Sequence, residues 1–305
     1  MSRSLNPYHV PVLAAQVVEA ISAIEPEVVL DATFGGGGHT RALLAVRPGL
    51  RVIALDRDPD AAAGAAALPG VAFHLADFRD LESIVEKEGL DELDGAIFDL
   101  GVSSHQLDVG ERGFSYRNPG PLDMRMGPDS AHDAGHYVNR VPVADLAGII
   151  RRFGEERFAG RIAAAIVAAR PIDDTARLAE VIAAAVPARA RDHGHPARRT
   201  FQAIRIAVND ELVALPAALD AALRLLRRGG RIAVISYHSL EDRIVKRRFA
   251  AGATGCICPP DLPVCGCGRT AELRLVPRRA VVPEETEIAA NPRARSARLR
   301  IAEKI

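Results

Sequence analysis

The sequence predicts an α/β protein whose doubly wound parallel sheet is interrupted by an inserted all-helical domain. Short apolar runs alternate with helical segments from the N-terminus to Asp99, which is the order that a parallel sheet requires. This alternation stops near Gln106, and residues 143–208 hold helical segments without a convincing strand. A clear strand returns at residues 231–237. We therefore expect residues 1–108 and 211–305 to form one discontinuous cofactor-binding domain, and residues 109–210 an inserted substrate-recognition domain.

Each expected element follows from its periodicity and from the turns beside it. Helical spacing of apolar residues over residues 12–24 precedes the first strand. Residues 110–130, rich in Gly, Pro and Asp, are expected to form a loop, and Arg228-Gly229-Gly230 a turn. The expected strands are residues 28–30, 51–55, 71–75, 95–98, 231–237, 272–276 and 297–302, and the expected helices after residue 140 are 143–153, 155–169, 175–186, 197–208 and 212–226.

The composition is that of a globular protein. Of the 305 residues, 48% are hydrophobic and 26% are charged, which is enough to bury a substantial core. No apolar run approaches the length of a membrane span, and the N-terminal segment lacks the apolar core of a signal peptide. We therefore expect a cytosolic protein with no membrane partner.

The net charge is zero, but the charges are unevenly distributed along the chain. Residues 1–139 contain 10 Lys and Arg against 21 Asp and Glu, residues 140–205 contain 12 against 7, and residues 227–305 contain 16 against 8. Basic later segments favour a polyanionic partner such as a nucleic acid. A solvated, arginine-rich surface without such a partner would show the same excess of basic residues.

The segment from Val28 to Thr40 predicts a nucleotide-shaped crevice at the end of the first strand. An apolar run there ends in Asp31, and four glycines, Gly35 to Gly38, follow before a helix begins. A carboxylate at this place would repel a pyrophosphate, but it suits S-adenosylmethionine, which has no phosphate and carries an ammonium and a sulfonium. A nicotinamide site fits less well, because Thr40 stands where the third glycine of G-x-G-x-x-G belongs, and no P-loop sequence follows. Tight packing alone also explains such glycines.

Three further strand ends carry residues suited to an adenosyl ligand. Asp56 lies 21 residues beyond the first glycine of the turn, a spacing at which an acid commonly accepts ribose hydroxyls. Asp77 and Phe78 would bind the amino edge of an adenine and cover its ring face. Asp99 ends the fourth strand. Because the carboxyl ends of parallel strands share one edge, these side chains are expected to converge, although Asp56 is also a natural helix N-cap.

All four cysteines lie in one short segment near the C-terminus. Cys256 and Cys258 are followed, after six residues, by Cys265 and Cys267. In a cytosolic protein this pattern favours a structural zinc site over disulfides, although C-x-C is not the spacing of a C-x-x-C knuckle. The alternative is a set of reduced thiols in a flexible loop. None lies near an expected strand end, which argues against the thiolate nucleophile that methylation at carbon 5 of a pyrimidine needs.

Nine short motifs are spread over nearly the whole chain. They are residues 31–40 (DATFGGGGHT), 56–59 (DRDP), 99–108 (DLGVSSHQLD), 112–115 (RGFS), 120–126 (GPLDMRM), 153–158 (FGEERF), 199–204 (RTFQAI), 238–243 (HSLEDR) and 291–296 (NPRARS). Together they resemble the bacterial 16S rRNA cytosine-N4 methyltransferase family. The resemblance implies a class I methyltransferase sheet with an inserted helical domain, and S-adenosylmethionine contacted by Gly37, Gly38, His39, Asp56, Phe78, Asp99 and Gln106. The implied substrate is a cytidine in the decoding region of the small ribosomal subunit.

The chemistry of such a reaction points to the strand ends. The exocyclic amine of cytosine is a poor nucleophile, so an acceptor for its hydrogens, near the developing positive charge, would assist methyl transfer. Asp99 is the expected acceptor, although the resemblance also directs it to the cofactor. His238 follows another strand end and is expected either to approach the base or to lie beside a helix N-cap formed by Ser239.

Contacts with RNA are expected from the loop and helices after Asp99. Phe114 and Tyr116 would stack on an extruded base, or else anchor a buried loop. Arg117, Arg125, Arg198 and Arg199 are the expected phosphate contacts.

Two other functions stay open from the sequence. An amino methyltransferase acting on DNA or protein would need the same cofactor site, and a non-catalytic RNA-binding protein of ribosome assembly would need only the fold. The partner in the first interpretation is 16S rRNA within the small ribosomal subunit. The sequence leaves open whether the chain forms a homodimer.

Overall fold

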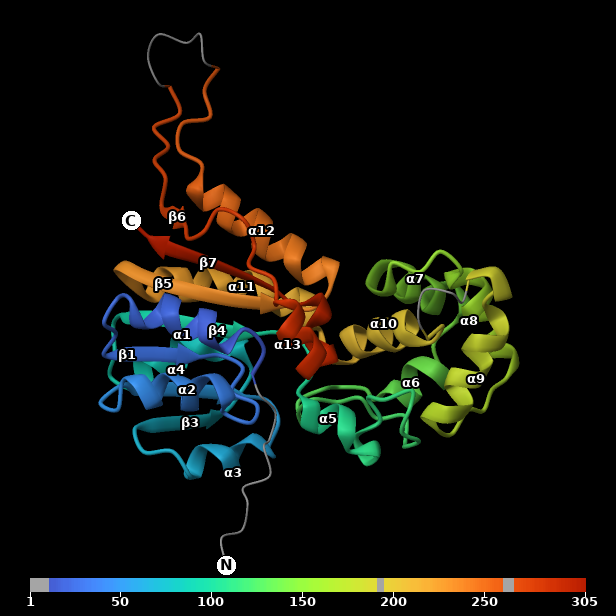
Figure 1. Ribbon diagram of the computed structural model, residues 1–305. Helices are drawn as coiled ribbons and strands as arrows, with labels where there is room; N and C mark the ends of the chain where they lie inside the picture. Colours follow the sequence, from blue (N-terminus) through green and yellow to red (C-terminus); the bar gives the residue numbers. More distant parts are fainter. Residues whose placement is uncertain (1–10, 191–194, 260–265) are drawn as a thin grey trace, which may run out of the picture. The chain divides into compact units, whose positions relative to one another are not determined.

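The computed structural model describes residues 11–190, 195–259 and 266–305, which form two compact units (Figure 1). The first unit comprises Met1–Gly101 and Val213–Ile305, and the second comprises Val102–Leu212. The chain therefore leaves the first unit once and returns to it later. The role of the second unit in substrate recognition stays a prediction.

The first unit contains a seven-stranded sheet in the order β3-β2-β1-β4-β5-β7-β6. Its strands are β1 Val28–Asp31, β2 Arg51–Asp56, β3 Val71–Leu75, β4 Leu93–Asp99, β5 Leu226–Ser236, β6 Leu273–Leu275 and β7 Arg298–Lys304. The first five are parallel, whereas β7 is antiparallel to β5 and β6. The strand order reverses between β1 and β4, where doubly wound sheets bind their ligands. The predicted α/β fold class is confirmed.

Alternate residues of the central strands pack on opposite faces of this sheet. Leu30, Ile53 and Phe98 belong to one buried core, whereas Val29 and Val52 belong to another. Helices α4 (Leu81–Lys87), α11 (Glu211–Leu225) and α12 (Ser239–Ala253) contribute to the first core, α1 (Ala14–Ser22), α2 (Gly38–Val46) and α3 (Ala61–Ala66) contribute to the second, and α13 (Glu285–Ala290) precedes β7. Because both faces are covered, polar side chains are concentrated at the strand ends.

The turn predicted before the last parallel strand is wrong, because β5 continues through it. Pairing with β4 jumps from Leu226 to Arg231, so that residues 227–230 bulge out of the ladder opposite Asp94. The Asp94 carboxylate binds the guanidinium of Arg227 across this bulge. Two glycines within a strand here mark a bulge, which sequence reasoning read as a turn.

The second unit is helical and has a core of its own. Leu146, Ile162 and Ile182 are fully buried in it. Its helices are α5 Ser104–Asp108, α6 Ala134–Asn139, α7 Val143–Gly154, α8 Ala159–Ala168, α9 Thr175–Ala185 and α10 Arg198–Asn209, of which the last four lie close to their predicted ranges. Within the described part of this unit, β-pairing is limited to an isolated bridge between Pro121 and Asp174. None of the helices that the structure describes is both long and apolar enough to span a membrane.

Candidate active site

The end of β1 holds the glycine turn through a buried carboxylate. Asp31 is 1% exposed, and its Oδ2 accepts a hydrogen bond from the Thr40 hydroxyl at 2.6 Å. Its Oδ1 accepts one from the Thr33 amide at 3.3 Å. Burial raises the pKa of Asp31 above its ordinary value, although the hydrogen bond from Thr40 opposes the shift. Asp31 therefore ties the strand end to the first turn of α2, and its contact with a ligand stays a prediction.

The turn between β1 and α2 requires glycine at two positions. Gly35 and Gly37 have φ angles of 52° and 71°, in the left-handed region that favours glycine. A Cβ at Gly37 would lie 2.5 Å from Cζ of Phe34, whereas a Cβ at Gly36 would meet nothing within 4 Å. Gly37 is also the N-cap of α2, and Gly38 is its first residue. The turn thus packs against the protein at Gly37 and leaves open space at Gly36, where a ligand can approach the backbone.

Asp56, at the end of β2, holds the same turn. Its Oδ2 accepts a hydrogen bond from the Gly35 amide at 2.6 Å, and its Oδ1 accepts one from the Asp58 amide at 2.8 Å. Burial raises the pKa of Asp56 to about 6, despite these two hydrogen bonds. The alternative interpretation of Asp56 as a helix cap is wrong, because α3 begins at Ala61 behind Asp60.

The end of β3 carries the aromatic ring of Phe78 and the carboxylate of Asp77, which is paired with two arginines. Asp77 is 6% exposed, and its Oδ2 lies 3.1 Å from nitrogens of both Arg57 and Arg79. Phe78 packs edge-on against Phe98, with 6.1 Å between ring centroids, and keeps part of its surface exposed. Asp77 thus holds the short turn that carries Phe78. The predicted contacts of both residues with adenine stay predictions.

The Asp99 carboxylate, at the end of β4, has a partner at each oxygen. The Tyr237 hydroxyl donates a hydrogen bond to Oδ1 at 2.8 Å, and Nε2 of His39 lies 3.4 Å from Oδ2. The Asp99 amide donates to Oγ1 of Thr33 at 2.6 Å. The side chain of Asp99 is 22% exposed, whereas that of His39 is only 6% exposed. The site therefore offers one oriented, reachable carboxylate, of whose partners His39 is the more deeply buried.

Burial and charge set the protonation of these two partners. Burial raises the pKa of Tyr237 well above its ordinary value, and the Asp99 charge raises it further, so the phenol stays a donor at neutral pH. Burial by itself lowers the pKa of His39, but the nearby Asp99 carboxylate outweighs burial and raises it. Both ring nitrogens of His39 are buried, and neither has a hydrogen-bond partner of good geometry among the described residues, so that Nε2 meets Asp99 only as an ion pair at 3.4 Å. Buried polar nitrogens of this kind usually have a partner, such as a water molecule or a ligand.

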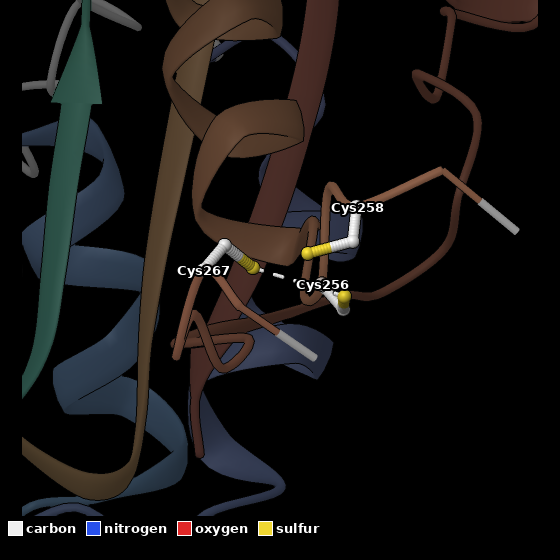
Figure 2. Close-up of side chains that lie close together, drawn as sticks. All are labelled: Cys256, Cys258 and Cys267. Atoms are coloured by element: carbon white, nitrogen blue, oxygen red, sulfur yellow. Dashed lines mark hydrogen bonds between the residues drawn. The ribbon is translucent and has the colours of Figure 1, made fainter. Parts of the chain in front are cut away.

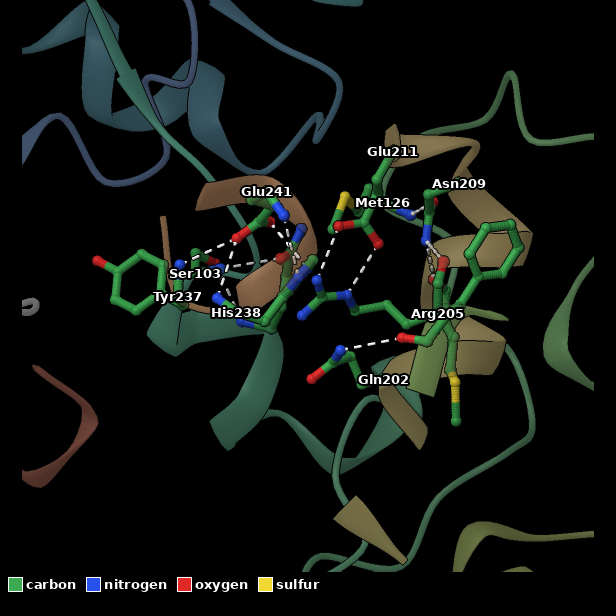
Figure 3. A network of polar contacts seen from close by, with 12 residues as sticks. Ser103, Met126, Gln202, Arg205, Asn209, Glu211, Tyr237, His238 and Glu241 are labelled. Atoms are coloured by element: carbon green, nitrogen blue, oxygen red, sulfur yellow. Dashed lines mark hydrogen bonds and ion pairs between the residues drawn. The ribbon is translucent and has the colours of Figure 1, made fainter. Parts of the chain in front are cut away.

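Tyr237 is a site residue that the sequence did not predict, because no local motif distinguishes it from its neighbour His238. His238 is the N-cap of α12, and its Nδ1 accepts a hydrogen bond from the Glu241 amide at 3.4 Å (Figure 3). Oε2 of Glu241 accepts from the Tyr237 amide at 2.9 Å. The expectation that Ser239 forms the cap is therefore wrong. The pairing of neighbouring strands could have identified Tyr237. This residue directly follows β5, and β5 lies beside β4, which ends at Asp99.

One residue predicted to touch the cofactor, Gln106, lies in the second unit. Gln106 is 5% exposed, and its Oε1 accepts a hydrogen bond from the Ser103 amide at 3.0 Å. Its own amide donates to Oγ of Ser103 at 3.2 Å, which completes a capping box at the start of α5. The structure gives Gln106 this local role, and its contact with a cofactor stays a prediction.

The two aromatic residues predicted to stack on RNA differ in exposure. Phe114 is 6% exposed within the core of the second unit, which fits the alternative of a buried loop anchor. Tyr116 is half-buried and stacks on His195, with 4.4 Å between centroids and 16° between planes. The Arg117 guanidinium lies 5.8 Å from the Tyr116 ring centroid. Tyr116 and Arg117 therefore form one partly exposed aromatic and cationic cluster.

The other predicted phosphate contacts are exposed arginines. Arg198 and Arg199 lie in the first turn of α10, where Arg199 also donates to the Glu155 carbonyl at 3.2 Å. Arg125 is bound through two hydrogen bonds, of 2.8 and 2.9 Å, to Asp123. A phosphate would therefore have to compete with a carboxylate for Arg125, but not for Arg199.

A buried asparagine fixes the loop that precedes α6. Asn209 is 1% exposed; its Oδ1 accepts from the Met126 amide at 2.8 Å, and its Nδ2 donates to the Met124 carbonyl at 2.8 Å (Figure 3). One turn earlier, Arg205 donates two hydrogen bonds of 2.8 Å to Glu211. The loop thus takes its conformation from the end of α10, which sequence reasoning did not identify.

Three of the predicted metal ligands come together in the structure. The Sγ atoms of Cys256, Cys258 and Cys267 lie within 4.8 Å of one another (Figure 2). The fourth, Cys265, lies outside the described residues.

Comparison with known proteins identifies the family of this chain. The model of the MraW methylase family matches residues 6–305. A relative named ribosomal RNA small subunit methyltransferase H, from Heliobacterium modesticaldum, is 51% identical over 309 residues, which cover 98% of this chain and 99% of the relative. A relative of the same name from Anaeromyxobacter dehalogenans is 53% identical over 306 residues, covering 97% and 98%. These matches confirm the resemblance seen in the motifs, and the chain belongs to the MraW methylase family.

Proposed function

We propose that this chain transfers a methyl group from S-adenosylmethionine to the N4 amine of a cytidine in 16S rRNA. Two relatives named ribosomal RNA small subunit methyltransferase H match it at 51% and 53% identity over nearly the whole of both chains. The observation that carries the proposal within the structure is the oriented Asp99 carboxylate beside the glycine turn. Methyl transfer to a weakly nucleophilic amine needs such an acceptor.

The first unit offers suitable groups for S-adenosylmethionine. The space at Gly36, where an added Cβ would meet nothing within 4 Å, leaves room for a ligand beside the turn, and Nδ1 of His39 is buried without a hydrogen-bond partner among the described residues. We assign the ribose hydroxyls to Asp56 and the adenine face to Phe78. When bound, the cofactor supplies a methyl group that its sulfonium already activates. The reaction therefore needs no metal, and a zinc ion at the cysteines would serve structure only.

Asp99 carries the chemistry of the acceptor. Each of its oxygens has one partner, Tyr237 or His39, and a carboxylate oxygen can accept more than one hydrogen bond. Asp99 can therefore accept an N–H of the cytosine amine and stabilise the positive charge that grows on that nitrogen. Because its orientation is fixed before substrate binds, no reorganisation is needed at the moment of transfer. The amine proton is then held at the same carboxylate.

We assign RNA recognition to the second unit. Tyr116 and Arg117 offer stacking and charge, and Arg198 and Arg199 offer exposed guanidinium groups for phosphates. The proposed partner is the small ribosomal subunit, and the proposed location is the cytoplasm, where that subunit is assembled. Sedimentation of the purified chain distinguishes a monomer from a homodimer.

The test uses labelled S-adenosylmethionine, with small subunits and naked 16S rRNA from a strain that lacks the gene. Wild type is compared with Asp99→Asn and with Asp91→Asn, which changes an exposed carboxylate of the same unit. We expect N4-methylcytidine, identified by nucleoside mass spectrometry, from wild type and Asp91→Asn but not from Asp99→Asn. Full activity of Asp99→Asn would contradict the role of Asp99.

The remaining outcomes separate the other functions. Cofactor binding without label in any RNA would overturn the rRNA assignment and direct the search to amines of DNA or protein. Absence of cofactor binding in a calorimetric titration would instead favour a non-catalytic protein of ribosome assembly.

A further inference from the structure

The connection between α12 and β6 brings three thiol side chains together, away from any hydrophobic core. Cys256, Cys258 and Cys267 are separated by up to 11 residues, yet their Sγ atoms all lie within 4.8 Å of one another (Figure 2). The connection extends from the end of α12 and returns to β6 (Figure 1). Cys265 lies outside the described residues, so the inference depends on the other three thiols.

Packing does not explain these cysteines. A structural cysteine is usually among the most buried residues of a protein, where it behaves as a small apolar side chain. Here Cys256 and Cys267 are exposed and Cys258 is only half-buried. The described residues of the connection, 254–259 and 266–272, include none that is buried. The thiols therefore cluster without an apolar environment that would draw them together.

The sulfur separation rules out a disulfide and fits both the thiol–thiol hydrogen bond between Cys267 and Cys256 and shared metal coordination. Sγ of Cys267 lies 3.7 Å from Sγ of Cys256, far beyond the ~2.05 Å of a disulfide bond. Zinc binds thiolates at ~2.3 Å in tetrahedral geometry, which places two sulfurs of one site ~3.8 Å apart. The cysteine pair thus already stands at the edge length of such a tetrahedron.

The described part of the connection also lacks an apolar core of its own. Its described ends are pinned to the last turns of α12, where Arg269 donates to the Ala251 carbonyl and the Glu272 amide donates to the Gly252 carbonyl at 2.8 Å. Ile257, between two of the cysteines, is 61% exposed. Beyond the pinned base, the described part has neither regular secondary structure nor buried apolar side chains. A bound ion would replace the missing core.

We propose that Cys256, Cys258 and Cys267 bind a zinc ion and thereby hold together residues 254–259 and 266–272. Three thiolates select a soft or borderline metal over Mg²⁺ or Ca²⁺, and zinc adds no redox chemistry. Each thiol loses its proton to solvent when its sulfur binds the ion, so binding weakens as the pH falls. The fourth position of the tetrahedron is left to a further donor.

The test measures metal directly and is independent of methyltransferase activity. The full chain, produced with zinc in the medium and purified without chelators, is assayed by plasma mass spectrometry. We expect one equivalent of zinc in wild type and background levels in the triple variant Cys256→Ser, Cys258→Ser, Cys267→Ser. The matched control Ile257→Ser, within the same segment, should keep the ion.

Cobalt exchange and circular dichroism keep the test decisive if the triple variant folds poorly. Cobalt bound to wild type should give the sulfur-to-metal charge-transfer absorption of thiolate ligands, and each single Cys→Ser variant should weaken it. Chelation should increase protease cleavage within residues 254–259 and 266–272. Background zinc in a folded wild type without a cobalt–thiolate band, or a cysteine disulfide found by mass spectrometry under anaerobic purification, would overturn the proposal.

Discussion

The Asp99 carboxylate shows how much of this site depends on single hydrogen bonds. Its charge comes from the residue itself, but the orientation of the carboxylate comes from Tyr237 and His39, while Thr33 accepts a hydrogen bond from the Asp99 backbone amide. Tyr237 stays protonated because burial and the Asp99 charge both raise its pKa. At this strand end the proposed catalytic carboxylate and its neutral positioning donor are thus two separate residues.

We predict that Tyr237→Phe lowers kcat about tenfold, since a hydrogen bond to a charged group contributes ~1.5–3 kcal/mol. The KM for RNA and the affinity for S-adenosylmethionine should stay close to wild type, because the ring itself is retained. Steady-state kinetics and calorimetric titration measure both. The matched control is Tyr137→Phe, which removes the partly buried hydrogen bond to the Ala207 carbonyl in the other unit and should lower stability without changing kcat. An unchanged kcat for Tyr237→Phe would refute the positioning role.

We predict that the affinity for S-adenosylmethionine depends on pH through the Asp56 carboxylate. Its pKa of about 6 means that the carboxylate becomes protonated as the pH falls from 7 to 5 and loses acceptor capacity for ribose hydroxyls. We expect the dissociation constant for S-adenosylmethionine to rise about tenfold over this range. Folding responds in the opposite sense: a raised pKa favours the protonated folded state, so this contribution to stability is lost as the pH rises through about 6.

Asp56→Asn is the control for this titration. The variant should bind more weakly at pH 7 and lack the Asp56 component of the pH dependence. The pKa of His39 is also raised, but His39 is present in both proteins. The difference between their two binding curves therefore reports on Asp56 alone. Parallel curves for the two proteins would show that Asp56 does not contact the ligand.

Sequence order was enough to identify the acids at the strand ends, but not their partners. Asp31, Asp56 and Asp99 follow apolar runs directly, so local pattern finds them. Tyr237 is placed by the register between β4 and β5, in which Asp99 pairs with Ile235. That register joins residues more than 130 positions apart, and no local pattern encodes it.

At the scale of elements, α12 begins with a histidine cap. We predict that His238→Ala destabilises the protein by about 1 kcal/mol, because it removes the side-chain acceptor of the cap. His238→Asn should retain most of the stability, since asparagine is a good N-cap. Urea denaturation measures both. If both variants keep their stability but lose kcat, His238 acts on the substrate and the cap is incidental.

The sequence predicted the elements that are long enough to show a periodic pattern of apolar residues. The helices α7 to α10 have 10 to 12 residues each, and β3 was expected over its full range. Helix α6, of six residues, is too short to show a period and was missed. The bulge in β5 was mistaken for a turn, because glycines mark both, and only the pairing with β4 distinguishes them.

For the whole molecule, separate cores predict separate responses to mutation. Ile162→Ala, at a fully buried position of the second unit, should destabilise that unit by about 3 kcal/mol. Affinity for S-adenosylmethionine should change little, because nearly all residues assigned to it lie in the first unit. Val143→Ala, exposed in the same unit, is the control and should change stability by less than about 0.5 kcal/mol. A parallel loss of cofactor affinity would show that the two units are energetically coupled.

The discontinuity of the first unit has a consequence for protein synthesis. Strands β1 to β4 leave the ribosome before β5 exists, because the 111 residues of Val102–Leu212 are translated in between. At a translation rate of ~5–20 residues per second, the edge of β4 that pairs with β5 stays unpaired for on the order of ten seconds. An unpaired edge of a buried strand is a template for aggregation. Chaperone capture of nascent chains should therefore peak while this insertion is being translated.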